Sequence, residues 1–348
     1  MEGELRHTTT TAAMAALLAT AVIGMAAPAA AFTACQVTDT GGVDDKSFNQ
    51  TAWEGAQAAA TDLGLEAKVL ESQAETDYAP NINSFIAEDC DIIITVGFLL
   101  GDATKVAAEA NPDRMFSIVD FAYDPTIPNI LGQVFATHEA AFLAGYVAAG
   151  MTNTGVIGTF GGINIGGPVT DFMDGFVWGA EYYNEQKGTD VQVLGWDPAT
   201  KEGLFTGNFE SLSDGRDFAQ NLNQEGADIV LPVAGPVGLG SAALASELGS
   251  DTLKVIGVDA DWYLTDPDHG GVYLTSVRKR VDATVYEAIK RANDGTFEGG
   301  LLVGTLENEG VGLAPFHDFD DDVPAELKAE VEALAAGILD GSIKVGGM

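Results

Sequence analysis

The chain has few basic residues and very little cysteine, and each shortage excludes a class of protein. Its 348 residues include 16 Lys and Arg against 52 Asp and Glu, which leaves a formal net charge of −36. Such a surface repels phosphate backbones and anionic lipid headgroups, so we do not expect a nucleic-acid-binding protein. Two cysteines and four scattered histidines argue against a disulfide-dominated miniprotein or a Cys/His metal cluster. The acidity itself is typical of a protein that stays soluble in salty surroundings.

Catalytic signatures are also missing. The sequence contains no HExxH motif, no GxSxG motif and no complete phosphate-binding loop. The segment GGVDDKS approaches the phosphate-loop pattern, but Asp45 stands where a Gly is required before Lys46, and its charge would repel a triphosphate. The acidic run over residues 318–322 lacks the Gly and distal Glu of a calcium loop. We therefore expect no enzyme activity, no cofactor and no metal.

A long apolar stretch occurs only near the N-terminus. Residues 11–31, TAAMAALLATAVIGMAAPAAA, carry no charge and end in the small-x-small pattern of a signal-peptide cleavage site. Pro28 and the high Ala content argue against a membrane anchor, and no later window offers the ~20 apolar residues of a spanning helix. We predict that residues 1–31 are an export signal peptide and that the mature protein is soluble and periplasmic or otherwise extracytoplasmic.

The cysteines, Cys35 and Cys90, each begin an apolar strand-like run, CQVTD and CDIIITV. In an exported protein an even pair is compatible with one disulfide, and adjacent parallel strands would bring these two positions together. Alternatively, Cys35 is acylated, although the residues before it make a poor lipoprotein signature. Both alternatives remain open at this stage.

After Phe32, short β-branched runs alternate with longer Ala-rich segments, which predicts an α/β fold with parallel sheets covered by helices. The first series of expected strands is 35–38, 67–71, 91–97, 115–119 and 130–135. A second series begins at Gly155 with GVIGTFGG and continues through VQVLGW, ADIVLPV and LKVIGVD. Two series of this length predict two doubly wound lobes.

The C-terminal segments add to this pattern. A further strand and helix follow in GGVYLTSVRKRVDATVYEAIKRAND, and GGLLVGTLENEGVGLAP is typical of a hairpin. Because the chain can cross between hinged lobes more than once, we assign residues 32–136 and 262–298 to lobe 1, and residues 137–261 and 299–348 to lobe 2. Ligands of such folds bind outside the carboxyl ends of the strands, here in a cleft between the lobes.

The loop after the first strand, DTGGVDDKSFNQ, leads into a helix. Ser47 and Gln50 match a capping box, with Ser47 as the N-cap. Phe48 and Asn49 then occupy the first helical turn, where they can face the cleft.

This helix start suits a flat heterocycle. The ring of Phe48 can stack, Asn49 offers both a donor and an acceptor, and Asp45 can accept from hydroxyls or ring N–H groups. The alternative reading is that Phe48 is a helix–core contact.

Several collinear strings carry a family resemblance: GGVDDKSFNQTAWEG, YAPNI, DIIITVGFLLGDA, PDRMFSIVD, AGYVAAG, GVIGTFGG, GNFESLSDGRDFA, GADIVLPVAGPVGLG, IGVDAD and LTSVRKRVD. Together they resemble the basic membrane protein family of ABC-transporter substrate-binding lipoproteins, whose best-known members bind purine nucleosides. The resemblance covers nearly the entire chain after residue 31. It implies a type I periplasmic-binding-protein fold, with two doubly wound parallel-sheet lobes joined by a multi-strand hinge.

In that family the cleft sandwiches the base between aromatic rings, while carboxylates and a lysine hold the ribose. The resemblance implies Phe209 as the second stacking ring, Gly238 as a point of close backbone approach, and Asp259 as a partner of ribose hydroxyls. The full set that it implies is Asp45, Phe48, Asn49, Asp120, Phe209, Gly238, Asp259, Asp261 and Lys279. Each has a structural alternative: a strand-end Asp often caps the next helix, Phe209 fits a core position, and Lys279 sits between two arginines.

We therefore expect a monomeric substrate-binding protein that delivers a purine nucleoside to an ABC permease in the inner membrane. A receptor for a sugar, another small polar solute or a riboflavin-like heterocycle, or a sensor subunit, is the alternative on the same fold. A nucleoside hydrolase is the alternative from another class, and it would need a metal-binding Asp cluster or a placed general base.

Overall fold

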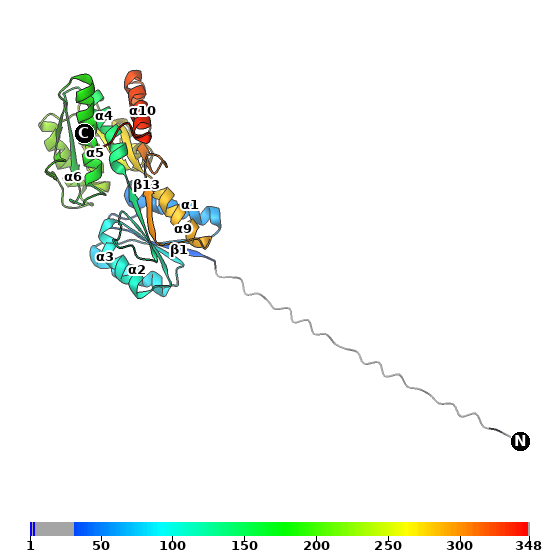
Figure 1. Cartoon of the computed structure of the whole chain (residues 1–348). Helices are drawn as coiled ribbons and strands as arrows, with labels where there is room; N and C mark the ends of the chain where they lie inside the picture. Colours follow the sequence, from blue (N-terminus) through cyan, green and yellow to red (C-terminus); the bar gives the residue numbers. More distant parts are fainter. Residues whose placement is uncertain (2, 4–30, 347–348) are drawn as a thin grey trace. The chain divides into compact units, whose positions relative to one another are not determined.

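Two six-stranded sheets organise the chain from Phe32 onward in the computed structural model (Figure 1). The structure describes residues 1, 3 and 31–346. The predicted export signal, residues 1–31, therefore lies almost wholly outside the described residues. Within the described residues, no helix is long and apolar enough to cross a membrane.

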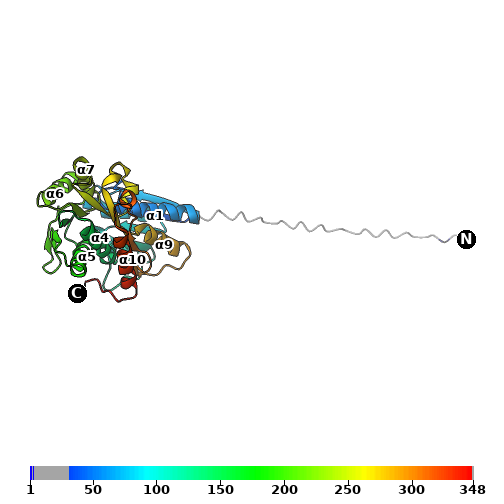
Figure 2. The same ribbon diagram turned by 90° about the horizontal axis from the view of Figure 1, so that it is seen from above.

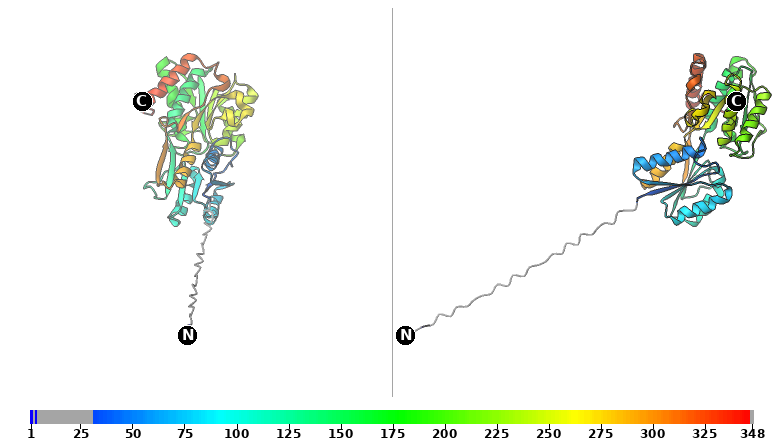
Figure 3. Two further views of the ribbon diagram at one scale, coloured as in Figure 1. Left: turned by 90° about the vertical axis from the view of Figure 1, so that its right-hand side faces the viewer. Right: turned by 180° about the vertical axis from the view of Figure 1, so that it is seen from behind.

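The first lobe is built on an entirely parallel sheet with the strand order β13-β5-β4-β3-β1-β2. Residues on opposite faces of its strands enter two separate cores, because side chains alternate along a strand. Ile92 and Ile94 of β3 pack under α1 and α9, whereas Ile93 packs under α2 and α3. The right-hand view of Figure 3 shows α1 (blue) and α9 (gold) on one face of this sheet, with α2 and α3 (cyan) on the other. The strands are β1 (Thr33–Val37), β2 (Glu66–Leu70), β3 (Ile92–Val96), β4 (Met115–Val119), β5 (Ile130–Phe135) and β13 (Gly300–Gly304), and the helices are α1 (Phe48–Leu63), α2 (Tyr78–Ala87), α3 (Gly101–Ala110) and α9 (Val281–Asn293).

The second lobe has the strand order β14-β12-β11-β10-β6-β7, in which β14 alone is antiparallel. In Figure 2, α4, α5 and α10 lie together, apart from α6 and α7. The tight packing of α4 on α5 depends on glycine, since a Cβ at Gly145 would lie 2.0 Å from the backbone oxygen of Phe176. The strands are β6 (Val156–Gly161), β7 (Gln192–Leu194), β10 (Ile229–Val233), β11 (Lys254–Asp259), β12 (Tyr273–Lys279) and β14 (Val311–Leu313), with a small β8 (Trp196–Asp197) and β9 (Glu202–Gly203) pair, and the helices are α4 (Thr137–Met151), α5 (Thr170–Lys187), α6 (Leu212–Gln224), α7 (Gly238–Leu248), α8 (Trp262–Thr265) and α10 (Ala325–Leu339).

The C-terminal segments distribute differently from the prediction. The strand near Thr275 is β12, which pairs with β11 in the second lobe and does not belong to the first. The expected terminal hairpin does not form, because β13 pairs with β5 of the first lobe and β14 pairs with β12 of the second. Only α9 of residues 262–298 packs as expected, against α1. Apolar periodicity identifies these strands but does not say which sheet edge receives them.

The chain consequently passes between the lobes at three places, after β5, after β12 and after β13. Three crossings form the multi-strand hinge that the fold class requires.

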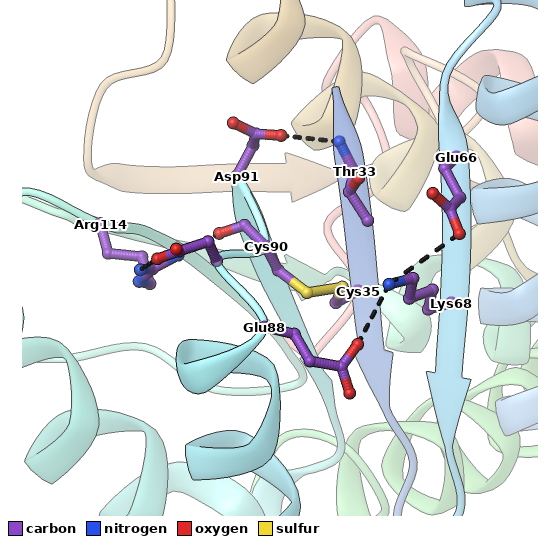
Figure 4. Close-up of a disulfide and its surroundings, with 9 residues drawn as sticks. Thr33, Cys35, Glu66, Lys68, Glu88, Cys90, Asp91 and Arg114 are labelled. Carbon is purple, nitrogen blue, oxygen red and sulfur yellow. Dashed lines mark hydrogen bonds and ion pairs between the residues drawn. A yellow bond between two sulfur atoms is a disulfide. The ribbon is translucent and has the colours of Figure 1, made fainter. Parts of the chain in front are cut away.

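The two cysteines form a disulfide (Figure 4). Cys35 lies in β1 and Cys90 lies two residues before the start of the neighbouring strand β3, and their Cα atoms are 6.0 Å apart. Both residues are fully buried. Of the two alternatives left open by the sequence, the structure has the disulfide, which leaves Cys35 without a thiol for acylation. Nearby, Lys68 of β2 forms ion pairs with Glu66 and Glu88.

Candidate ligand-binding site

A pocket of about 610 Å³, including its part open to solvent, is lined by loops that follow strands of both sheets. Its first-lobe wall follows β1, β3 and β4, and its second-lobe wall follows β6, β10 and β11, together with the end of β12 and the start of α5. This is the position that doubly wound sheets offer to ligands. The lining residues are Asp39, Thr40, Asp45, Phe48, Asn49, Gly97, Phe98, Leu99, Asp120, Ile165, Pro168, Val169, Phe172, Phe209, Val233, Gly235, Pro236, Val258, Asp259 and Lys279.

A buried lysine stands at the centre of the charged part of this pocket. Lys279 Nζ lies 2.8 Å from Asp120 Oδ2 and 3.0 Å from Asp259 Oδ1, and all three side chains are at most 8% exposed. Burial lowers the pKa of Lys279, but the two carboxylates outweigh burial and hold that pKa above its usual value. Burial also raises the pKa of Asp120. Two carboxylates sharing one ammonium leave an excess of acceptors, which suits a ligand rich in hydroxyl groups.

Aromatic rings surround the same ammonium. Lys279 Nζ lies 4.6 Å from the ring centroid of Phe48, 5.6 Å from that of Phe172 and 5.7 Å from that of Phe135. Phe48 and Phe172 also line the pocket, and Phe209 enters it from the second lobe. Phe209 packs directly on a glycine, because a Cβ at Gly162 would lie 2.3 Å from its ring. The pocket therefore combines flat apolar walls with a polar end.

The start of α1 is held by Asp45 and not by the predicted capping box. Asp45 accepts hydrogen bonds from the backbone N–H groups of Ser47, Asn49 and Gln50, at 3.0, 2.8 and 3.0 Å. Ser47 occupies the N-cap position as predicted, but its side chain makes no cap bond. Its hydroxyl donates instead to Val258 O and Asp259 Oδ2 of the second lobe. The predicted capping box does not form, because the buried carboxylate of Asp45, two residues before Ser47, accepts the backbone N–H groups at the start of α1.

Asn49 is similarly occupied within its own lobe. Its Oδ1 accepts from the backbone N–H of Asp39 at 3.1 Å, and its Nδ2 donates to Thr40 O and Asp45 Oδ2. Asp45 and Asn49 thus line the pocket while bracing the loop that follows β1.

Of the nine ligand-binding residues that the resemblance implies, all except Gly238 and Asp261 line the pocket. Gly238 is needed for packing, since a Cβ there would lie 2.5 Å from the Trp262 ring. The glycine that borders the pocket in this segment is Gly235, whose φ is 53°. Asp261 pairs with His317 Nε2 at 2.8 Å.

Other pocket residues were not predicted from the sequence. Asp39 and Gly97 follow β1 and β3, so the strand-end rule applied to Asp120 and Asp259 would have found them as well. Phe172 lies in the first turn of α5, where the apolar pattern of a core helix conceals it.

A ligand pocket between two doubly wound lobes is the arrangement expected of a solute-binding protein. The model of the PnrA-like ABC transporter substrate-binding proteins matches residues 32–340, and the chain belongs to this family. Over 331 residues it is 34% identical to the CD4+ T-cell-stimulating antigen of Listeria monocytogenes, a match that covers 90% of this chain and 88% of the relative. Over 325 residues it is 34% identical to the ABC transporter nucleoside-binding protein BmpA of Lactococcus lactis, covering 89% and 87%.

A solved structure confirms the fold class. An ABC transporter solute-binding protein of Aeropyrum pernix superposes with a TM-score of 0.81 at 26% identity, covering 90% of this chain and 92% of that one. The type I periplasmic-binding-protein fold expected from the sequence is therefore correct. The protein is an extracytoplasmic substrate-binding component of an ABC transporter, works with a membrane permease and is not an enzyme.

Proposed function

We propose that the ligand is a purine nucleoside. The observation that carries this proposal is the pairing of aromatic walls with the cluster of Asp120, Asp259 and Lys279 in one pocket. Phe48 and Phe209 supply rings for stacking on a base, and the two carboxylates supply acceptors for ribose hydroxyls. The Lactococcus lactis relative is named a nucleoside-binding protein, which supports the same class of ligand.

A sugar receptor is the main alternative on this fold. The wall of Phe48, Phe98, Phe172 and Phe209, together with Ile165, Val169 and Val233, is more apolar than the belt of polar groups that a free sugar needs. This observation favours a ligand with a flat heterocycle attached to a polar group.

Isothermal titration of purine nucleosides, pyrimidine nucleosides, free bases, riboflavin and pentoses tests the ligand class. We expect purine nucleosides to bind, and binding by pentoses alone would overturn the proposal. Phe48→Ala removes one stacking ring and should cost about 1–3 kcal/mol, or roughly 5- to 150-fold in affinity. Phe297→Ala is the matched control, because Phe297 packs on the same first-lobe core but does not line the pocket.

We also propose that residues 1–31 direct export and that the mature protein acts as a monomer. N-terminal sequencing of the secreted protein tests the first point: a first residue at or close to Phe32 supports it, and retention of residues 1–31 contradicts it. Light scattering of the purified protein tests the second point, since a mass twice that of one chain would contradict it.

A further inference from the structure

A second pocket adjoins the ligand pocket at the charged cluster. It has a volume of about 850 Å³, including its part open to solvent, and it shares Phe98, Asp120 and Pro168 with the ligand pocket. Residues 134–137, at the crossing after β5, and Val303 of β13 also line it. The second pocket therefore extends from the ligand pocket along two of the three segments that connect the lobes.

Contacts between the lobes at the start of α1 leave the second pocket open. The Ser47 hydroxyl donates to Val258 O at 3.0 Å, and the Thr265 hydroxyl donates to Lys46 O at 2.7 Å. Among the described residues, none that lines the second pocket belongs to α1 or to the loop before it. A group bound in the second pocket is therefore compatible with these contacts between the lobes.

The walls of the second pocket are largely apolar and incompletely covered. The ring centroids of Phe98 and Phe121 lie 5.0 Å apart, and Phe135 provides a third ring. Phe98 is 38% exposed and Val303 is 42% exposed. Because removing apolar surface from water is favourable, an apolar ligand group that covers these side chains is stabilised there.

The charges that line the second pocket are negative. Asp120 and Asp171 contribute carboxylates, and none of the described lining residues is Lys, Arg or His. The ammonium of Lys279 pairs with Asp120, and His138 Nδ1 lies 3.9 Å from Asp171 Oδ2, but neither Lys279 nor His138 lines this pocket. An anionic ligand group would therefore meet charges of its own sign, in a protein whose net charge is already −36.

We propose that the second pocket takes a neutral, apolar group on C5′ of a purine nucleoside, so that the protein binds 5′-alkylthio nucleosides and rejects nucleoside 5′-phosphates. This inference rests on the proposed function. With the 2′- and 3′-hydroxyls of the ribose on the carboxylates of Asp120 and Asp259, C5′ is the sugar carbon left to carry a further group. Since Asp120 lines both pockets, that group enters the second pocket while the base stays between Phe48 and Phe209.

A thioether and a phosphate on C5′ meet opposite conditions in the second pocket. A thioether is apolar, and its sulfur makes favourable contacts with aromatic rings such as those of Phe98 and Phe121. A phosphate monoester carries a charge of about −1.5 to −2 at pH 7. Here it would face Asp120 and Asp171 without a basic lining residue, and removing an unpaired charge from water is costly.

Titration calorimetry on the full mature chain tests the inference with three ligands for each base. These are adenosine and inosine as parent nucleosides, their 5′-deoxy-5′-methylthio derivatives and their 5′-monophosphates. We expect the methylthio derivatives to bind within fivefold of their parents or more tightly. The monophosphates should bind at least twentyfold more weakly than their parents.

Gly166→Phe places a bulky side chain in the second pocket. Gly166 lines it and is exposed, its φ lies outside the left-handed region, and a Cβ there would have no non-neighbouring atom within 4 Å. We expect the affinity of the methylthio derivative relative to its parent to fall at least fivefold. Gly271→Phe is the matched control, because Gly271 is also exposed, has the same free space and lines neither pocket.

Asp171→Asn tests the charge selection separately. It removes one of the two carboxylates that line the second pocket, so the affinity of the monophosphate relative to its parent should rise at least threefold. Asp62→Asn, on the exposed side of α1, is the charge-matched control. An unchanged relative affinity of the monophosphate in Asp171→Asn would overturn the charge selection.

Methylthio derivatives that bind more than fivefold more weakly than their parents, or monophosphates that bind within twentyfold of them, would overturn this inference and leave the proposed nucleoside function intact. An equal loss for parent and derivative in Gly166→Phe would show that the second pocket serves the approach of the lobes and would also overturn it. If no nucleoside binds, the proposed function and this inference fall together. If Gly166→Phe does not fold, the three ligands on the unaltered protein and on Asp171→Asn decide.

Discussion

Asp120 and Asp259 end strands in different lobes, yet both adopt a left-handed backbone, with φ of 64° and 66°. Asp120 directly follows β4 and Asp259 is the last residue of β11, and each directs its carboxylate to the same Lys279 ammonium. A non-glycine residue in this region carries a cost of order 1–3 kcal/mol, which the surrounding structure must offset. Because the strain occurs twice at one ammonium, the two lobes share a preorganised polar centre that spans the cleft.

Loss of the central cation should therefore destabilise the protein strongly. Lys279→Met keeps the side-chain length but leaves two buried carboxylates without their ammonium, and we expect the free energy of unfolding to fall by about 3–5 kcal/mol. Urea denaturation measures this change.

Lys105→Met is the control for this experiment, since Lys105 is half-exposed and pairs with the exposed Glu109 at 4.0 Å; its effect should stay within about 0.5 kcal/mol. Adding Asp120→Asn and Asp259→Asn to Lys279→Met should recover part of the loss. A loss below about 1 kcal/mol for Lys279→Met alone would show that the ammonium does not stabilise the folded state.

Much of the site could be predicted because strand ends in a doubly wound fold follow a simple rule. Asp120 and Asp259 each terminate an apolar run, and parallel strands bring their carboxyl ends to one edge. The same physics explains the disulfide, since Cys35 lies in β1 and Cys90 lies just before the adjacent parallel strand β3. These features depend on local pattern and strand direction, which the sequence records.

Some features could not be predicted from the sequence, because they depend on contacts between residues that are far apart along the chain. Nothing local indicates that β12 and β13 join different sheets, because the choice rests on which sheet edge each strand can complete. Ser47 has the right type and spacing for a cap, but Asp45 takes its N–H partners while Val258 O takes its hydroxyl. Gly238 lies outside the lining of the pocket and packs against Trp262, a contact between distant segments that no local pattern records.

The capping role of Asp45 leads to a second prediction. Asp45→Ala leaves three backbone N–H groups at the start of α1 without an acceptor, so we expect a loss of about 2 kcal/mol in the free energy of unfolding. Gln50→Ala should change it by less than about 0.5 kcal/mol, since the Gln50 side-chain amide donates to the exposed Glu54. Thermal or urea unfolding compares the two variants. A larger effect for Gln50→Ala than for Asp45→Ala would restore the capping box.

The disulfide should contribute substantially to stability. The two cysteines are 55 residues apart, and a loop of that length predicts about 4 kcal/mol from the restricted unfolded chain. We expect Cys35→Ala with Cys90→Ala to lower the urea midpoint accordingly. Because both sulfurs are buried, reductant alone should leave the unaltered protein folded. Equal urea midpoints for the double variant and the oxidised protein would refute the stabilising role.

Acidification from pH 7 toward pH 4 should first increase stability. Burial raises the pKa of Asp39 and of Asp45 to about 6 each, against ordinary values of 3.8. The folded protein therefore binds protons that the unfolded chain does not, and the free energy of unfolding rises as pH falls through 6 and levels off below about 4. Neutralising part of the net charge of −36 acts in the same direction.

Differential scanning calorimetry between pH 4.5 and 7.5 measures this slope, at constant ionic strength so that screening does not change. Asp39→Asn removes one of the two groups and should flatten the slope between pH 5 and 7, whereas Asp62→Asn, on an exposed position of the same lobe, should leave it nearly unchanged. A melting temperature that falls steadily from pH 7 to pH 5 in the unaltered protein would mean that the two carboxyls are ionised in the folded state at ordinary pKa values. In that case the hydrogen bonds that the two carboxylates accept would offset the effect of their burial on the pKa.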